Sequence, residues 1–285
     1  MQTVTRMARM VALAGLLAAT SAYGAALDRI RDKGEIVLGY VADAAPFSSA
    51  DGKGQPQGYS VDLCREIATG IQKQLALAKL DVRWVQLTSQ DRIPAVRAGR
   101  VDIECSTTTW TLGRQQEVDF SLITFVDGAS IIAKDTGDIH RFADFAGRRI
   151  AVIRGTTTVG ALQGALSARG MASVVVPVAD RAEGLRMLQK GEVQGFASDR
   201  IVLIALALKD PATENFRILD DDFSLEQYAL ALPRGDHDFR LAVNRVITGL
   251  YRTGAIMPIY KRSLGMLGEP SMLLRAAYFL QSLAD

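Results

Sequence analysis

The chain alternates short apolar runs with amphipathic segments, and this alternation begins near residue 34. Runs of β-branched or alternating side chains predict strands, and apolar residues spaced by three and four predict helices. The expected strands of the first part are 34–41, 81–87 and 100–106, and the expected helices between them are 59–75 and 92–99. Pro94 is tolerated in a first helical turn, and Gly99 ends that helix. This order predicts a parallel, doubly wound α/β sheet.

The same pattern restarts near residue 145, where a strand ends in a Gly/Thr turn, and it closes with helices. The expected strands of this second part are 145–158, 173–178, 192–198 and 228–235, and the expected helices are 159–170, 180–191, 199–208, 239–254 and 255–264.

Two segments resemble each other internally. Residues 91–107 and 180–199 share an Asp-Arg helix start, an apolar helix face, a stop glycine and a strand that ends in polar residues. The repeat predicts two similar lobes whose strand C-termini face a shared cleft, where open α/β sheets bind ligands. Convergent use of the same α/β sequence pattern is the alternative explanation.

The C-terminal helices need a packing partner, and we expect them to return to the first lobe. The chain would then cross between lobes twice, near 124–131 and 225–231. Two crossing strands can act as a hinge for domain closure. The predicted organisation is lobe 1 at 27–125 plus 230–285 and lobe 2 at 126–229.

The first 25 residues are typical of a secretory signal sequence. Arg6 and Arg9 precede an apolar run at 10–19, and small residues follow it. The run is too short to span a bilayer as a helix. We expect cleavage near Gly24 and a periplasmic mature protein; a retained membrane anchor is the alternative.

The charge of the mature chain excludes one class of partner. The formal net charge of the 285 residues is +2, and it falls to zero when the two signal arginines are removed. Such a protein has no bulk positive field to attract nucleic acid or anionic membranes. No second apolar stretch approaches 18 residues, and 200–208 is expected to be a buried helix.

The chain has two cysteines, Cys64 and Cys105. In an exported protein such a pair favours a disulfide, and two buried free thiols are the alternative. Closing a loop of about 40 residues would stabilise the fold by about 4 kcal/mol in the chain-entropy model.

Residues 105–121 place three threonines after an apolar strand and Arg114 five residues later. Exposed backbone N–H groups, hydroxyls and a guanidinium suit a carboxylate. Alternatively, the threonines cap a helix and Arg114 pairs with Glu117 on the surface. No metal-ligand spacing stands nearby, and we expect no metal or other cofactor.

Residues 154–158 (RGTTT) offer a second hydroxyl-rich helix N-terminus, without the spacing of a P-loop. Asp199 ends a predicted strand, where it could accept hydrogen bonds from an ammonium group or cap the next helix. Hydrogen-bond donors that suit a ligand carboxylate in one place, and a carboxylate that suits a ligand ammonium group in another, together fit a free α-amino acid.

Eight short motifs together carry a resemblance to a known family. They are GEIVLGY, GYSVDLC, TSQDRIP, VDIECSTTT, RQQEVDFS, FADFAGRRIAV, GTTT and LRMLQKG, and they span nearly all of the mature chain. The chain resembles the family 3 periplasmic solute-binding proteins of ABC importers, especially their glutamate/aspartate-binding branch. The resemblance implies a two-lobed fold with a ligand cleft, and a monomer that delivers an amino acid to an ABC permease.

The resemblance also implies roles for individual residues. Those expected at the α-carboxylate are Arg114 and Thr109, with Thr157 near it from the second lobe. Thr156, in the same turn as Thr157, is expected to be a further ligand-binding residue. Those expected at the α-ammonium are Asp199 and Thr107. Those expected at the ligand side chain are Ser89 and Arg92, which would bind its carboxylate, and Phe47 as an apolar wall.

Three positions depart from the pattern of that branch. Val41 stands where an arginine is usual, Arg181 where a histidine is usual, and Arg154 where a small polar residue is usual. We expect Arg181 to replace the missing cation and Arg154 to be an additional site residue. The alternative for Arg181 is a solvated side chain paired with Asp180 or Glu183. The ligand is therefore expected to be glutamate or aspartate, with another dicarboxylate-like amino acid open.

Two other functions compete with amino-acid delivery. A periplasmic enzyme on the same fold, such as a cyclohexadienyl dehydratase, needs a general acid over a leaving group. The two histidines, His140 and His237, lie in hydrophilic segments outside the expected cleft, although Asp or Glu could serve instead. A sensor that never meets a transporter is the third possibility. We expect a binding protein and not an enzyme.

Overall fold

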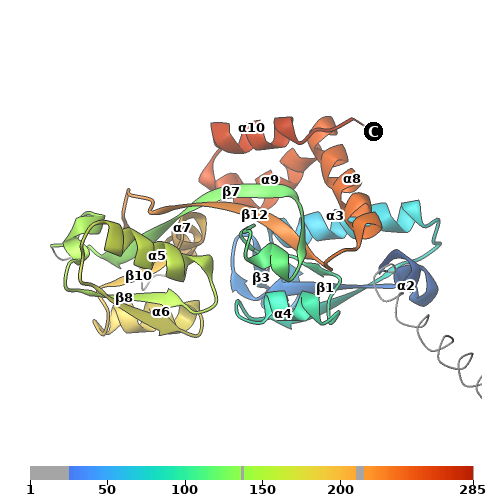
Figure 1. Cartoon of the computed structure of the whole chain (residues 1–285). Helices are drawn as coiled ribbons and strands as arrows, with labels where there is room; N and C mark the ends of the chain where they lie inside the picture. The colour runs from blue at the N-terminus through green and yellow to red at the C-terminus, as the bar shows by residue number, and fades with distance from the viewer. Residues whose placement is uncertain (1–25, 136–137, 210–214, 285) are drawn as a thin grey trace, which may run out of the picture.

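The computed structural model describes residues 26–135, 138–209 and 215–284. The predicted signal sequence, residues 1–25, lies outside the described residues. The chain forms two α/β lobes joined by two long strands, as Figure 1 shows. Among the described residues, no helix combines the length and the apolarity needed to cross a bilayer.

The first lobe is built on three parallel strands in the order β5-β1-β6, as the alternating pattern predicts. These strands are β1 (Glu35–Val41), β5 (Asp81–Leu87) and β6 (Ile103–Glu104). Its helices are α2 (Ala26–Lys33), α3 (Tyr59–Gln74), α4 (Arg92–Arg97), α8 (His237–Thr253), α9 (Ile256–Leu264) and α10 (Met272–Leu280). A small antiparallel sheet adds β2 (Asp43–Ala44), β3 (Ser48–Ala50) and β4 (Pro56–Gln57).

The second lobe repeats the strand order of the first. Its parallel strands run β9-β8-β10, and they are β8 (Arg149–Ile153), β9 (Val174–Val178) and β10 (Gly195–Asp199). Its helices are α5 (Thr157–Ala168), α6 (Arg181–Gln189) and α7 (Arg200–Lys209), and β11 (Phe216–Ile218) pairs with the crossing strand β7. The internally similar segments therefore form equivalent units, α4–β6 in one lobe and α6–β10 in the other.

Two strands connect the lobes where crossings were predicted. They are β7 (Asp119–Lys134) and β12 (Ser224–Leu232), which pair antiparallel with each other. Strand β7 also pairs with β10, and β12 pairs with β6. The two expected sheets are thus two wings of one continuous, curled sheet, which has nine strands among the described residues. The proposed lobe boundaries, 125/126 and 229/230, fall within these two strands and stay a prediction.

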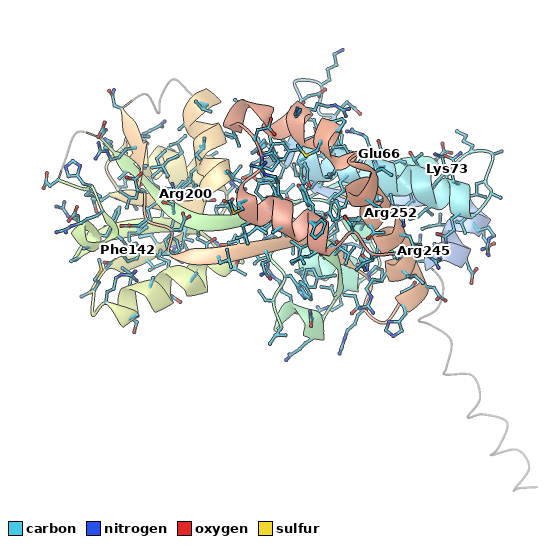
Figure 2. All side chains as sticks on the ribbon, turned by 90° about the horizontal axis from the view of Figure 1, so that it is seen from above. Glu66, Lys73, Phe142, Arg200, Arg245 and Arg252 are labelled. Atoms are coloured by element: carbon cyan, nitrogen blue, oxygen red, sulfur yellow. A yellow bond between two sulfur atoms is a disulfide. The ribbon has the colours of Figure 1, made fainter. Side chains whose placement is uncertain are left out.

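The C-terminal helices return to the first lobe, as expected. Helix α10, which the sequence pattern did not single out, packs against β7 and α8. The Tyr278 hydroxyl lies 2.8 Å from that of Tyr59 on α3, and the Gln281 side chain exchanges hydrogen bonds with the backbone of Ile123. Figure 2, in which Arg252 marks helix α8 and Phe142 marks the second lobe, shows these helices crowded over one lobe only.

The core of the first lobe contains an aromatic cluster. Phe47, Tyr59, Phe125 and Tyr228 are each at most 5 % exposed, and their rings contact one another edge-on or stacked. Two of these residues belong to the crossing strands, because Phe125 lies on β7 and Tyr228 on β12. The crossing is therefore anchored in the core of the first lobe.

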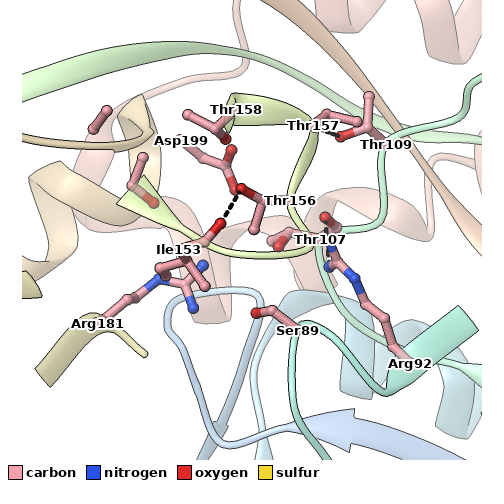
Figure 3. Close-up of a pocket in the computed structure, with 12 residues that line it drawn as sticks. Ser89, Arg92, Thr107, Thr109, Ile153, Thr156, Thr157, Thr158, Arg181 and Asp199 are labelled. Atoms are coloured by element: carbon pink, nitrogen blue, oxygen red, sulfur yellow. Dashed lines mark hydrogen bonds between the residues drawn. The ribbon is translucent and has the colours of Figure 1, made fainter. Parts of the chain in front are cut away.

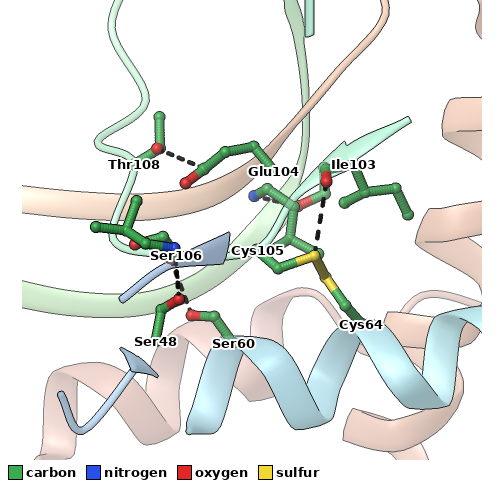
Figure 4. Close-up of a disulfide and its surroundings, with 11 residues drawn as sticks. Ser48, Ser60, Cys64, Ile103, Glu104, Cys105, Ser106 and Thr108 are labelled. Atoms are coloured by element: carbon green, nitrogen blue, oxygen red, sulfur yellow. Dashed lines mark hydrogen bonds between the residues drawn. A yellow bond between two sulfur atoms is a disulfide. The ribbon is translucent and has the colours of Figure 1, made fainter. Parts of the chain in front are cut away.

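A disulfide joins Cys64 on helix α3 to Cys105, which directly follows β6 (Figure 4). The Cα atoms are 6.2 Å apart, within the range that such bonds span. The predicted bond is therefore present, and the free-thiol alternative is wrong. The next residue, Ser106, accepts a hydrogen bond from Ser60 of the same helix at its carbonyl. Helix α3 thus holds the start of the polar turn that follows β6.

Candidate functional site

A polar cavity lies between the two lobes, at the carboxyl ends of β6, β8 and β10 (Figure 3). This is the edge where open α/β sheets bind ligands. Its lining consists of Ser89, Arg92, Thr107, Thr109, Ile153, Thr156, Thr157, Thr158, Arg181, Ala197, Ser198 and Asp199. Hydroxyl groups dominate the lining, and its charged groups are two arginines and one aspartate. Eight of the sequence-predicted site residues are brought together here.

Arg92 is the first residue of helix α4 and is 3 % exposed. One guanidinium nitrogen donates to the Thr107 carbonyl at 3.0 Å, while its Nε–H has no partner among the described residues. Glu104, a fully buried acid at the end of β6, interacts with this guanidinium. Burial raises the pKa of Glu104, and the positive charge of Arg92 partly opposes that rise. Arg92 is therefore held in place by the Thr107 carbonyl, and its Nε–H remains beside the cavity as a hydrogen-bond donor without an acceptor among the described residues.

Arg114 borders the cavity without belonging to its lining. Its guanidinium donates to the Thr109 carbonyl at 2.8 Å and to the Gly155 carbonyl of the other lobe at 3.4 Å. Burial, and next the nearby Arg92 charge, lower the pKa of Arg114 to about 10. The alternative pairing with Glu117 is wrong, because Glu117 pairs with Arg97 at 2.6 Å.

The second lobe contributes the start of helix α5 and the end of β10. Thr156 donates from its hydroxyl to the Ile153 carbonyl at 2.7 Å, which closes the turn before the helix. Asp199 ends β10 and is 8 % exposed. Burial raises its pKa, while the Arg181 guanidinium lowers it. In the first turn of helix α7 the Ile201 N–H is taken by Asp127, so Asp199 does not cap that amide.

Arg181 begins helix α6 and lines the cavity from the second lobe. It is 5 % exposed, and its guanidinium donates across the cleft to Asp43 at 3.0 Å. The alternative of a solvated Arg181 paired with Asp180 or Glu183 is wrong. Asp180 instead accepts from the Glu183 N–H as the helix cap, and Glu183 accepts from the Ala179 N–H.

Sequence reasoning missed Glu226, which lies on the crossing strand β12 and is 2 % exposed. One of its oxygens accepts from Thr109 of the first lobe at 2.6 Å and from Thr157 of the second at 3.0 Å. The two hydroxyls are themselves 3.1 Å apart. The available signal was the acid Glu226 directly before the apolar run YALAL, in a segment predicted to cross between the lobes. Glu226 thus couples the hydroxyl turns of both lobes.

Two predicted site residues lie elsewhere. Phe47 is fully buried in the aromatic cluster and is not among the cavity-lining residues. Arg154 is exposed, and its guanidinium donates to the Pro177 carbonyl at 3.4 Å, away from the lining. Arg154 is therefore a surface residue in this conformation, and a ligand role for Phe47 stays a prediction.

The lobes meet closely around the cavity. Its free volume is about 10 Å³, the room that one water molecule needs. Gly155 has φ +78°, and a Cβ there would lie 2.9 Å from Gln90 of the other lobe. An amino acid is much larger than one water, so the lobes or their side chains must move apart to admit it.

A further buried acid near the cavity is Asp127, which lies on the crossing strand β7 and interacts with Asp199. Its carboxylate accepts from the Tyr228 hydroxyl at 3.2 Å and from the N–H groups of Gly128 and Ile201. Burial, and next the neighbouring Asp199, raise its pKa from 3.8 to about 7. Since the folded pKa exceeds the unfolded one, Asp127 contributes stability below pH 3.8 that is lost as pH rises through about 7.

We expect Asp127→Asn to remove a pH dependence of stability. Between pH 5 and pH 8 the free energy of unfolding of the wild type should fall, relative to the variant, by about 3 kcal/mol. Urea titrations of both proteins at these two pH values measure this difference. A constant offset between the two proteins at both pH values would show that Asp127 is ionised throughout, contrary to this expectation.

No group of three or more His, Cys, Asp or Glu side chains suited to a metal occurs within the described residues. His140 lies beside Arg217, and His237 begins helix α8 beside Arg240. Neither histidine is part of the cavity lining. The polar side chains that line the cavity carry guanidinium, hydroxyl and carboxylate groups.

Comparisons with known proteins agree with this arrangement. The sequence matches the family described as bacterial extracellular solute-binding proteins, family 3, over residues 36–266. It is 33% identical over 237 residues to an L-glutamate/L-aspartate-binding protein of Pseudomonas aeruginosa, covering 83% of this chain and 78% of that protein. It is 32% identical over 233 residues to a glutamate/aspartate import solute-binding protein of Salmonella typhimurium, covering 82% and 77%.

A solved structure is similar in fold. It is an ancestral amino acid-binding protein described as a precursor of cyclohexadienyl dehydratase, with a TM-score of 0.71 and 26% identity. The similarity covers 83% of this chain and 97% of that one. The correspondence therefore extends over most of the described chain.

Proposed function

Because the chain belongs to family 3 of the bacterial extracellular solute-binding proteins, we propose that it captures an acidic amino acid, glutamate or aspartate. It then delivers this ligand to the membrane permease of an ABC importer. The relatives named for glutamate and aspartate binding support the ligand class. The mature protein acts as a periplasmic monomer after removal of its signal sequence.

One observation supports the proposal that the ligand is acidic. Two buried arginines, Arg92 from the first lobe and Arg181 from the second, line the cavity on either side (Figure 3). Each has an Nε–H without a partner among the described residues. A buried charged donor without an acceptor is costly, and a carboxylate placed between them would satisfy both.

The remaining groups fit the two ends of an α-amino acid. Arg114 and Thr109 bind the α-carboxylate, with Thr156 and Thr157 facing it from helix α5. Asp199 and Thr107 accept from the α-ammonium group. Ser89 joins Arg92 and Arg181 at the side-chain carboxylate. Opening at the crossing strands β7 and β12, near the proposed lobe boundaries, admits the ligand.

Binding without catalysis is the proposed role. The structural relative that preceded a dehydratase is itself described as an amino acid-binding protein. A dehydratase would need an acid placed to protonate a leaving group. In the cavity lining the acid is Asp199, which lies beside Arg181 and fits an ammonium group.

We expect calorimetry to find glutamate or aspartate as the tightest ligand. Protein unfolded and refolded to remove carried-over ligand should be titrated with each of the twenty amino acids. Glutamate should bind more tightly than glutamine, because both unpartnered donors then face a full negative charge. Equal affinity for glutamate and glutamine would reject the acidic ligand, and heat from none of the twenty would reject amino-acid capture.

A further inference from the structure

The two lobes also meet through an ion pair, on the side of the cavity opposite the contact between Thr109 and Thr157. Asp43, on strand β2 of the first lobe, accepts from the Arg181 guanidinium at 3.0 Å with one oxygen. Its other oxygen accepts from the Arg181 backbone N–H at 3.2 Å. One carboxylate therefore holds both the side chain and the first amide of helix α6, and both interactions cross the cleft.

This contact is placed differently from the other polar contacts between the lobes. Thr109 and Thr157 meet beside Glu226 on the crossing strand β12. Figure 3 shows Arg181 at the opposite side of the cavity from that Thr109–Thr157 contact. A contact far from the crossing strands is broken most readily when the lobes rotate apart, so it depends strongly on closure.

The pair is also asymmetric in burial. The Arg181 side chain is 6 % exposed and lines the cavity, whereas the Asp43 side chain is 38 % exposed and lies outside the lining. Asp43 binds one terminal nitrogen of the guanidinium, and the Nε–H stays without a partner among the described residues. Asp43 thus orients Arg181 from outside while a donor remains beside the cavity.

We propose that Asp43 is a positioning residue that closes the two lobes over the ligand by holding Arg181 and the start of helix α6. This inference rests on the proposed amino-acid capture. Asp43 acts on the closed form alone, because its partners belong to the other lobe. Asp43 lies outside the cavity lining, so its effect on closure is common to every amino acid that closes the lobes, and its hold on Arg181 adds a smaller loss for ligands with a side-chain carboxylate.

The test compares Asp43→Asn with the wild type by calorimetry against glutamate and glutamine. The partly exposed ion pair and the interaction with the helix N-terminus are each modest. We therefore expect both ligands to bind roughly three- to thirty-fold more weakly. The matched control is Asp81→Asn, which removes a carboxylate of the same lobe that is paired with Lys79 on the surface. The control should bind as the wild type does.

A double-mutant cycle separates this role from damage to the first lobe. In an Arg181→Gln background, Asp43→Asn should cost less than half as much on the logarithmic scale, because the partner charge is already gone. The melting temperature of Asp43→Asn should match that of Asp81→Asn. Wild-type affinity in Asp43→Asn, or an equal loss with and without Arg181, would overturn the inference.

The two proposals fail in distinguishable ways. If the wild type binds neither glutamate nor glutamine, the same variants are titrated with whichever amino acid binds most tightly, and the expected common loss is unchanged. If no amino acid binds at all, X-ray scattering of the ligand-free proteins becomes the test. Asp43→Asn should then have a larger radius of gyration than the wild type, and identical profiles would overturn the role of Asp43.

Discussion

Arg114→Ala is expected to weaken glutamate binding by about 2–5 kcal/mol, or roughly thirty- to several-thousand-fold. In the proposed site the guanidinium binds the α-carboxylate in a closed cleft, and its loss leaves that charge poorly paired. The same side chain donates to Thr109 of its own lobe and to Gly155 of the other. Calorimetry on refolded protein measures the change.

The matched control for this prediction is Arg97→Ala on the same lobe. Arg97 is exposed and pairs with Glu117 on the surface, so its removal should leave the affinity unchanged. Arg114→Lys should fall between the wild type and Arg114→Ala, because lysine keeps the charge but loses the planar, bidentate donor. Undiminished affinity in Arg114→Ala would remove this residue from the site.

Replacing Cys64 and Cys105 together by serine is expected to lower the free energy of unfolding by about 4 kcal/mol. The bond closes a loop with a sequence separation of 41 residues, and the chain-entropy model assigns a loop of this length about that value. The variant should also loosen the turn at 106–109, since helix α3 holds its start through this bond and through Ser60. Urea unfolding of both proteins at one pH gives the comparison.

Two measurements accompany the cysteine variant. Wild-type protein expressed in the periplasm, unfolded and left unreduced, should show no titratable thiol. Wild type unfolded and refolded with a reductant should be destabilised about as much as the variant, which separates the lost bond from the serine hydroxyls. Two free thiols per chain in the unreduced protein would contradict the expectation.

Local patterns were sufficient for most helices and for the central strands. The apolar spacing of 59–75 and 239–254 identified α3 and α8 almost to the residue, because each helix buries one continuous face. The strand at 34–41 was clear because β1 is buried from its second residue onward and follows a turn glycine. The strand at 81–87 was recognised from its alternation, although β5 buries only its last residue fully. In contrast, the predicted strand 100–106 is paired only at Ile103–Glu104, because the chain then leaves the sheet to form the polar turn.

Strand β7 was recognised only as a crossing, although it runs for 16 residues. Its length depends on successive antiparallel partners, β12 and then β10, which are distant in sequence. Helix α10 was missed because its position depends on β7 and α8 and not on a long periodic run. These elements are stabilised by pairing and packing that no local window contains.

The candidate site also has features that the sequence determined and features that only the tertiary structure decided. The sequence by itself determined the chemistry of the turns, because hydroxyls, arginines and an acid placed after strands indicate a ligand with carboxylate and ammonium groups. It also determined the cysteine pair and the repeat that makes two similar lobes. Only the tertiary structure decided which groups face one another. Glu226 joins Thr109 to Thr157, and Arg181 reaches Asp43 across the cleft. Such partners are set by the docking of two lobes, and the free energy of that docking depends on residues that lie 48 to 138 positions apart in the sequence.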